Sequence, residues 1–253
     1  MNLLDGIKSD WTYITGFRRI IGAIGKFDPE AEYTVADAIE DAVDDHDDRL
    51  FMSFEGQEIS YAEFDKRANQ FAHWGQAAGL RKGDCIALFM ENRPDYIAFW
   101  AGMSKIAVKV ALINYNLTGT GLAHCVKITN ARAIVMNPEL APQFETARAQ
   151  TPLELGAFVL GGPVASMTQI DADVDKAWTE RPNKSVRAGV KGGEVALYIY
   201  TSGTTGLPKG CIHTHRTIGH NVVSGAVWGN GTMESVSLAV VPMFHITGML
   251  YGL

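Results

Sequence analysis

Cysteine, net positive charge and long hydrophobic runs are all scarce in this sequence. Its three cysteines, Cys85, Cys125 and Cys211, lie too far apart for a disulfide framework and have no zinc-type spacing. We interpret them as reduced thiols in a cytoplasmic protein. The formal net charge of -6 provides no basic field to attract a polyanion, which disfavours nucleic acid as a partner.

No metal-ligand pattern is found among the histidines either. The cluster of His213, His215 and His220 has spacings that fit no familiar metal site, so we predict no metal ligands and place these residues on a helix surface.

The amino-terminal extension, residues 1–30, contains one apolar cluster at 20–24. Arg18, Arg19 and Lys26 crowd this cluster, which is too short for a signal-peptide core or a membrane span. It predicts an amphipathic helix; the alternative is a helix that contacts a membrane surface. Any membrane contact is therefore expected to be peripheral.

Apolar strands alternating with helices dominate the rest of the sequence. With 253 residues, 47% of them hydrophobic, the chain can bury a core as one large domain or two lobes. Strands are expected at 50–54, 57–60, 85–90, 107–113, 133–136, 195–201 and 236–241. Helices are expected to begin near Thr34, Tyr61, Pro94, residue 118 and Thr214. This order predicts an α/β fold of mostly parallel sheets flanked by helices.

Residues 161–193 interrupt the alternation. They are rich in glycine and proline and show little hydrophobic periodicity. We predict a surface connection here, and a boundary between two lobes.

The segment from Tyr200 to Gly210 carries the most specific signal, with the sequence YTSGTTGLPKG directly after an apolar strand. Gly203 and Gly206 allow the backbone to turn sharply and bring amide groups close to an anion. Lys209 adds a compact positive charge. Three hydroxyl donors complete the set: Ser202, Thr204 and Thr205. This combination predicts a phosphate-binding loop.

The residues of the loop disfavour two other interpretations. A flexible surface loop has similar glycine and hydroxyl content, but it does not require the ordered combination seen here. The standard P-loop needs lysine directly after its second glycine, whereas Leu207 and Pro208 separate Gly206 from Lys209. A GTPase or kinase of the P-loop type is therefore disfavoured.

The loop resembles the signature of the adenylate-forming, or AMP-binding, superfamily, which includes acyl-CoA synthetases, firefly luciferases and peptide-synthetase adenylation domains. In that family the loop holds the β- and γ-phosphates of ATP. The resemblance implies this role for Thr201, Ser202, Gly203, Thr204, Thr205, Gly206 and Lys209. Among these it implies catalytic roles for Thr204 and Lys209.

Other segments resemble the same family in the same order. They are 51–80, Glu91–Pro94 with the following Phe99 and Trp100, and Val241–His245. Asn92, with 111–116 and 122–125, is similar to the fatty-acid-transport and long-chain branch. The resemblance implies that Phe244 and His245 bind the acid. From its apolar neighbours alone, His245 is better explained as a packed core residue.

The resemblance implies an acid:CoA ligase that uses ATP, Mg²⁺ and CoA to activate a carboxylic acid, expected to be a fatty acid, through an acyl-adenylate. Residues 31–253 then form part of the adenylation domain, and a carboxy-terminal domain is expected to be absent. One alternative is a protein of the same fold that binds or helps to transport fatty acids without ligase activity. Another is an unrelated nucleotide-binding module with a similar glycine-rich turn.

Overall fold

The computed structural model describes residues 21–22, 24–151, 153, 155–201, 206–228 and 235–251. Most of the amino-terminal extension, including the start of its predicted amphipathic helix, lies outside these residues. Within the described part of the chain, no helix has the length and apolarity needed to cross a membrane.

The described chain begins with a helix and a hairpin, as predicted. Helix α2 spans Val35–His46, and strands β1 (Leu50–Phe54) and β2 (Gln57–Ser60) pair antiparallel. Glu55 and Gly56 both have positive φ, 50° and 82°, as a tight hairpin turn requires. Ser60 then caps helix α3 (Tyr61–Ala77): its hydroxyl accepts the Glu63 N–H, and the Glu63 carboxylate accepts the Ser60 N–H.

Seven strands form the central sheet, in the order β7-β6-β5-β3-β4-β8-β9. All neighbouring pairs are parallel except β8 and β9. The strands are β3 (Cys85–Phe89), β4 (Lys109–Leu112), β5 (Ala133–Met136), β6 (Gly156–Val159), β7 (Thr168–Gln169), β8 (Val195–Thr201) and β9 (Lys209–Thr214). The predicted α/β fold with a mostly parallel sheet is confirmed.

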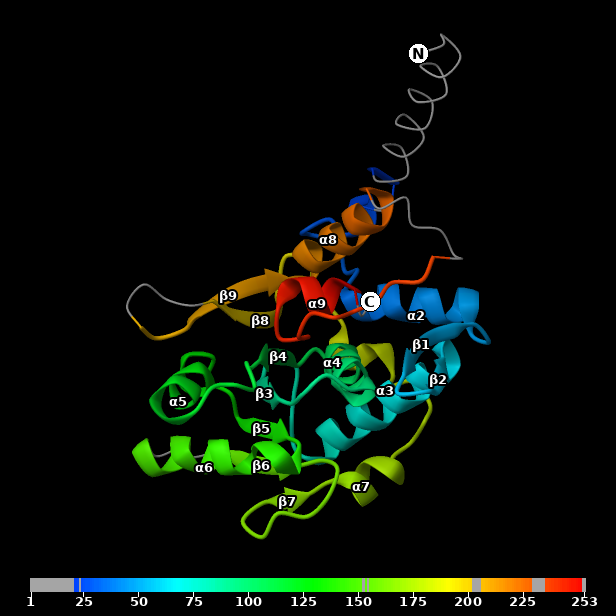
Figure 1. Ribbon diagram of the computed structural model, residues 1–253. Helices are drawn as coiled ribbons and strands as arrows, with labels where there is room; N and C mark the ends of the chain where they lie inside the picture. Colours follow the sequence, from blue (N-terminus) through cyan, green and yellow to red (C-terminus); the bar gives the residue numbers. More distant parts are fainter. Residues whose placement is uncertain are drawn as a thin grey trace, which may run out of the picture.

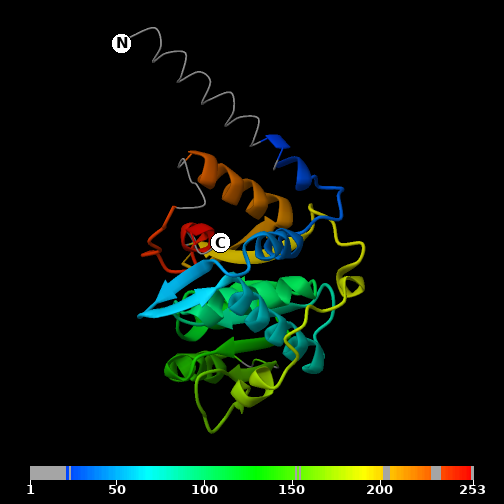
Figure 2. The same ribbon diagram turned by 90° about the vertical axis from the view of Figure 1, so that its right-hand side faces the viewer.

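Helices cover both faces of this sheet. Figure 1 shows α5 (Gly119–Ile128) and α6 (Ala141–Gln150) on one side of β3 and β5, and α3 with α4 (Pro94–Lys105) on the other. A short 3-10 helix, η1 (Pro138–Leu140), leads into α6. On the α4 side lie also α2, α8 (His215–Trp228) and α9 (Ile246–Tyr251), and Figure 2 shows α8 above α2. Because both faces are covered there, the central strands β3, β4 and β5 are continuous apolar runs rather than alternating ones.

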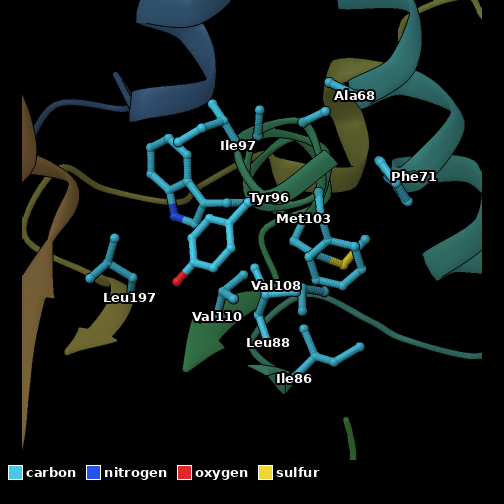
Figure 3. Close-up of a cluster of buried hydrophobic side chains, with 14 of the residues drawn as sticks. Ala68, Phe71, Ile86, Leu88, Tyr96, Ile97, Met103, Val108, Val110 and Leu197 are labelled. Carbon is cyan, nitrogen blue, oxygen red and sulfur yellow. The ribbon is translucent and has the colours of Figure 1, made fainter. Parts of the chain in front are cut away.

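The larger core lies between α4 and the sheet. Figure 3 shows Leu88, Val110 and Leu197, from three neighbouring strands, beneath Tyr96 of α4. All four side chains are almost completely buried. Burial on this scale fixes α4 on the sheet, and so fixes the loops at both of its ends.

The connection from 161 to 193 contains β7, helix α7 (Asp171–Asp175) and a 3-10 helix, η2 (Lys184–Arg187). The strands on its two sides belong to one sheet, so the boundary between lobes stays a prediction. A buried group of charges ties the connection to α2, α3 and α4. We call it the ion cluster and define it as Glu40, Asp65, Lys105, Arg181 and Arg187.

Distances within the ion cluster are short. Lys105 Nζ lies 2.5 Å from Asp65 Oδ1, and Arg187 Nη2 lies 2.6 Å from Glu40 Oε2. Arg181 Nε lies 3.0 Å from the other Asp65 oxygen. Opposite charges therefore compensate one another where water is excluded, as buried charges require.

Two strand predictions were wrong near the end of the chain. Residues 236–241 form no strand, because in the described part of the chain no strand pairs with them; Val236 and Leu238 are 94% and 83% exposed. In contrast, β9 was not expected, since Gly210 and the polar residues after it give no clear strand pattern. It forms by pairing with the strongly apolar β8.

Candidate phosphate and acid site

Three parallel strands end at one edge of the sheet. Leu112 of β4 lies opposite Leu88 of β3 and Ile199 of β8, so the loops that follow these strands come together. Ligands of open α/β sheets bind at such carboxyl edges. Thr201, which ends β8, and the turn with Phe244 and His245 both belong to this edge.

The phosphate loop connects two antiparallel strands. Thr201 at the end of β8 lies opposite Lys209 at the start of β9, so their side chains project on the same face of the sheet. Both residues are exposed, and Gly206 between them has a φ of +87°. Four predicted phosphate ligands lie outside the described residues: Ser202, Gly203, Thr204 and Thr205.

This hairpin corrects the expected connection. The sequence suggested a turn leading from a strand to a helix, but α8 begins only at His215, after β9 has ended. The helix dipole at the start of α8 is therefore separated from the loop by a whole strand. The predicted phosphate site therefore relies on the residues of the loop itself, with Lys209 as its described cation.

Both ends of the loop are attached to α5. The Tyr200 hydroxyl donates to the Cys125 carbonyl oxygen at 2.6 Å, and burial raises the pKa of Tyr200 well above its usual value. His124 Nε2 lies 3.1 Å from the Pro208 carbonyl oxygen. In the tautomer that carries hydrogen on Nε2, His124 donates a hydrogen bond to this oxygen. Sequence reasoning missed His124, because only the pairing of β8 with β4 brings α5 to the loop.

Phe244 and His245 occupy a turn directly before α9. Phe244 is buried and meets Tyr115 edge to face, with ring centroids 5.0 Å apart. His245 is exposed, and its ring lies against Phe244 at 4.5 Å. This exposure contradicts the alternative that His245 is a packed core residue. Tyr115 follows β4, so the turn stands over the carboxyl edge.

The histidines after the loop differ from the prediction that all lie on a helix surface. His213 lies on β9 and is half-buried. His215 is buried, and its Nδ1 accepts the Val35 N–H of α2 at 3.3 Å. Burial lowers the pKa of His215 to about 4, so the imidazole is neutral at physiological pH. The side chain joins α8 to α2 and has a structural role.

The three cysteines form no disulfide among the described residues. All three are free, and two of them, Cys85 and Cys125, are buried. Burial raises their pKa values to about 11 and about 12. Neither thiol ionises at neutral pH, and neither is suited to act as a nucleophile.

A family model described as AMP-binding enzyme matches residues 39–253. The chain belongs to the AMP-binding enzyme family. This agrees with the resemblance seen in the loop and in the segments around it.

Curated relatives of this chain include long-chain fatty acid transport proteins. It is 31% identical over 207 residues to long-chain fatty acid transport protein 2 of Rattus norvegicus, covering 80% of this chain and 33% of the relative. It is 31% identical over 229 residues to protein 1 of Bos taurus, covering 88% of this chain and 35% of the relative. The chain thus spans about a third of the length of these relatives.

Solved structures show the same fold. A long-chain-fatty-acid-CoA ligase from Archaeoglobus fulgidus superposes with a TM-score of 0.73 at 23% identity, covering 88% of this chain and 45% of that chain. An anthranilate CoA ligase in complex with anthranoyl-AMP gives a TM-score of 0.73 at 21% identity, covering 87% and 43%. At these identities the likeness shows the fold alone.

Proposed function

We propose that this chain is the phosphate-binding part of an ATP-dependent acid:CoA ligase whose acid is a long-chain fatty acid. The proposal depends chiefly on one observation: Thr201 and Lys209 face each other across a hairpin whose loop has the sequence SGTTGLP, at the carboxyl edge that also carries His245. Membership of the AMP-binding enzyme family and the names of the relatives support it.

The proposed reaction has two steps. The acid's carboxylate attacks the α-phosphorus of ATP, which forms the acyl-adenylate and releases pyrophosphate. The CoA thiol, losing its proton, then attacks the acyl carbon, which forms the thioester and releases AMP. Lys209 would stabilise negative charge on the departing pyrophosphate through position and charge, without covalent catalysis.

On the acid side, His245 has a different role. Its exposed ring next to the buried Phe244 offers one polar group at the border of an apolar wall. An imidazole N–H there would orient the carboxylate by a hydrogen bond while the hydrocarbon chain avoids the phosphates.

Magnesium is expected to reach this part of the site bound to ATP. Among the described residues, no group of three or more His, Cys, Asp or Glu side chains is placed to hold a metal ion. Mg²⁺ commonly binds substrate phosphates and keeps several waters, so the expected ion would enter with ATP. No step of the mechanism is assigned to a magnesium ligand in these residues.

Pyrophosphate release tests the proposal. The complete protein with ATP and hexadecanoate should release pyrophosphate, and Lys209→Ala should slow this release without a change in the free energy of unfolding. Lys127→Ala is a matched control, because Lys127 is an exposed lysine on α5 outside the loop. Equal rates for both variants would contradict the proposal.

A second function is favoured by the names of the relatives. A protein that binds or transports long-chain fatty acids without ligase activity would also match long-chain fatty acid transport proteins. Its distinguishing result is hexadecanoate binding by a wild-type protein that releases no pyrophosphate with ATP.

A further inference from the structure

The side chain of Asn92 holds the turn that carries Phe244 and His245. Asn92 Oδ1 accepts the Met243 N–H at 2.8 Å, and Asn92 Nδ2 donates to the Val241 carbonyl oxygen at 3.2 Å. One amide thus binds a donor and an acceptor of the same turn, about 150 residues away in sequence. An amide side chain suits this role because it offers both a donor and an acceptor.

The Val241 carbonyl group is closed in from the other side by α9. A Cβ atom added to Gly248 would lie 2.3 Å from the Pro242 carbonyl oxygen and 2.8 Å from that of Val241. Gly248 therefore permits a close approach of α9 to the turn. Val241 is half-buried, and within the described part of the chain Asn92 is the hydrogen-bond donor to its carbonyl oxygen, a contact whose loss should cost stability.

Asn92 is itself held in place from the sheet. It follows β3 and stands two residues before Pro94, the first residue of α4. The preceding Glu91 N–H donates to Asn137 Oδ1 at 3.2 Å, and Asn137, which follows β5, is fully buried. The amide of Asn92 is thus presented to the turn from a backbone fixed at both ends.

A second contact holds the same turn from the next strand. Tyr115 follows β4, and its ring meets Phe244 edge to face. The Tyr115 carbonyl oxygen accepts from Gln143 Nε2 of α6 at 3.1 Å. The loops after β3 and β4 together determine where the backbone of the turn lies, and so where His245 is presented.

We infer that Asn92 is a positioning residue for the acid site. It sets the height of the Phe244–His245 turn above the carboxyl edge, and thereby the distance between the bound carboxylate and the phosphates held by the hairpin loop. The inference rests on the proposed function. A misplacement of about 1 Å at a reacting group costs on the order of 100-fold in rate, so two hydrogen bonds far from the chemistry can affect it strongly.

Two substitutions separate positioning from folding. Asn92→Ala removes both hydrogen bonds, whereas Asn92→Asp keeps the acceptor for Met243 and loses the donor to Val241. We expect Asn92→Ala to reduce kcat/KM for hexadecanoate roughly 10- to 100-fold, with KM for ATP changed less than about twofold. Asn92→Asp should lie between this variant and wild type.

Hydrogen exchange on the 253-residue chain gives an independent measurement. The Met243 amide should exchange faster in Asn92→Ala than in wild type, because its acceptor is gone. Asn183→Ala is the matched control, since Asn183 also accepts one backbone N–H, that of Ser185, but at η2. The control should leave both Met243 exchange and the kinetics with hexadecanoate unchanged.

The outcomes distinguish the inference from the proposed function. If wild type releases no pyrophosphate, the proposed function is wrong, and the positioning role for that reaction falls with it. If wild type is active and His245→Ala alters the kinetics with hexadecanoate but a folded Asn92→Ala does not, only the inference is overturned. Equal losses for hexadecanoate and ATP in Asn92→Ala would show a general structural role and would also overturn it.

Discussion

The ion cluster and the carboxyl edge use similar charged residues in opposite ways. Lys105 in the cluster is fully buried, and its ammonium contacts Asp65 and Asn69 at 2.5 and 2.7 Å. Lys209 at the edge is exposed and forms no ion pair with a described residue. A lysine whose partners are supplied by the protein stabilises the fold, whereas one without such partners is available to a ligand.

The ion cluster and the carboxyl edge also hold different segments of the chain in place. The ion cluster holds η2 and the connection before β8, so it fixes how the chain returns to the sheet. The edge holds short loops and a turn by a few hydrogen bonds and ring contacts. Substitutions in the first region should change the free energy of unfolding, and those in the second should change ligand kinetics.

The largest effect is expected from Lys105→Met. Removing the ammonium leaves Asp65 and Glu40 as buried carboxylates with less compensation, which should lower the free energy of unfolding by about 3–5 kcal/mol. Chemical denaturation measures it. Retention of wild-type stability would show that Arg181 and Arg187 compensate Asp65 and Glu40 by themselves.

Lys209→Ala should show the reverse pattern. The loss of one preorganised phosphate contact should reduce transition-state stabilisation by roughly 2–4 kcal/mol, and the free energy of unfolding should change by less than about 0.5 kcal/mol. Thr204→Ala, outside the described residues, is expected to act in the same direction. Pyrophosphate release and denaturation on the same samples measure both quantities; a large stability loss with normal turnover would assign the loop to structure.

The buried His215, which joins α8 to α2, predicts how stability depends on pH. Its folded pKa of about 4 lies below the usual value of 6.5, so between these pH values the unfolded state binds the proton and the native state does not. The contribution of His215 to the free energy of unfolding is therefore fully present above pH 6.5. It falls by about 3 kcal/mol at most as the pH drops towards 4. His215→Asn should remove this slope, as the Asn amide accepts the Val35 N–H without titrating. An unchanged slope between pH 4 and 6.5 would contradict the assignment.

The smallest effect is expected at the rim of the ion cluster. Lys184 lies 3.2 Å from Glu40 Oε2, but its side chain is 66% exposed. Solvent screens this pair, so Lys184→Met should lower the free energy of unfolding by less than about 1 kcal/mol. A loss as large as that of Lys105→Met would show that exposure does not separate the two lysines, and the comparison would fail.

Much of the fold was predictable because its signals are local. The turn at Glu55 and Gly56, the capping box at Ser60 and the apolar strands of the sheet all follow from neighbouring residues. The predicted bounds of β1, β2, β5 and β8 match the structure. Strand β9 was missed because Lys209 and Gly210 have weak strand preference and the segment pairs only where β8 is already in place.

The candidate site also contains some features that the local sequence predicted and others that it did not. The loop between Thr201 and Lys209 was identified from its own sequence, since its residue types and their order are specific. The exposure of His245 was not decided by its apolar neighbours, which favour a buried residue. The roles of Asn92 and His124 depend on partners far away in sequence and had no local signal.

The sequence by itself determined most of the elements, the mostly parallel sheet and the place of the glycine-rich loop, because hydrophobic periodicity, caps and glycine positions act over a few residues. Only the tertiary structure decided which side chains meet: that Lys105 is compensated in a buried ion cluster, that β9 turns the loop into a hairpin, and that one amide, Asn92, holds the turn of His245. These contacts join segments up to about 150 residues apart, and their energies depend on burial and geometry that no local pattern specifies.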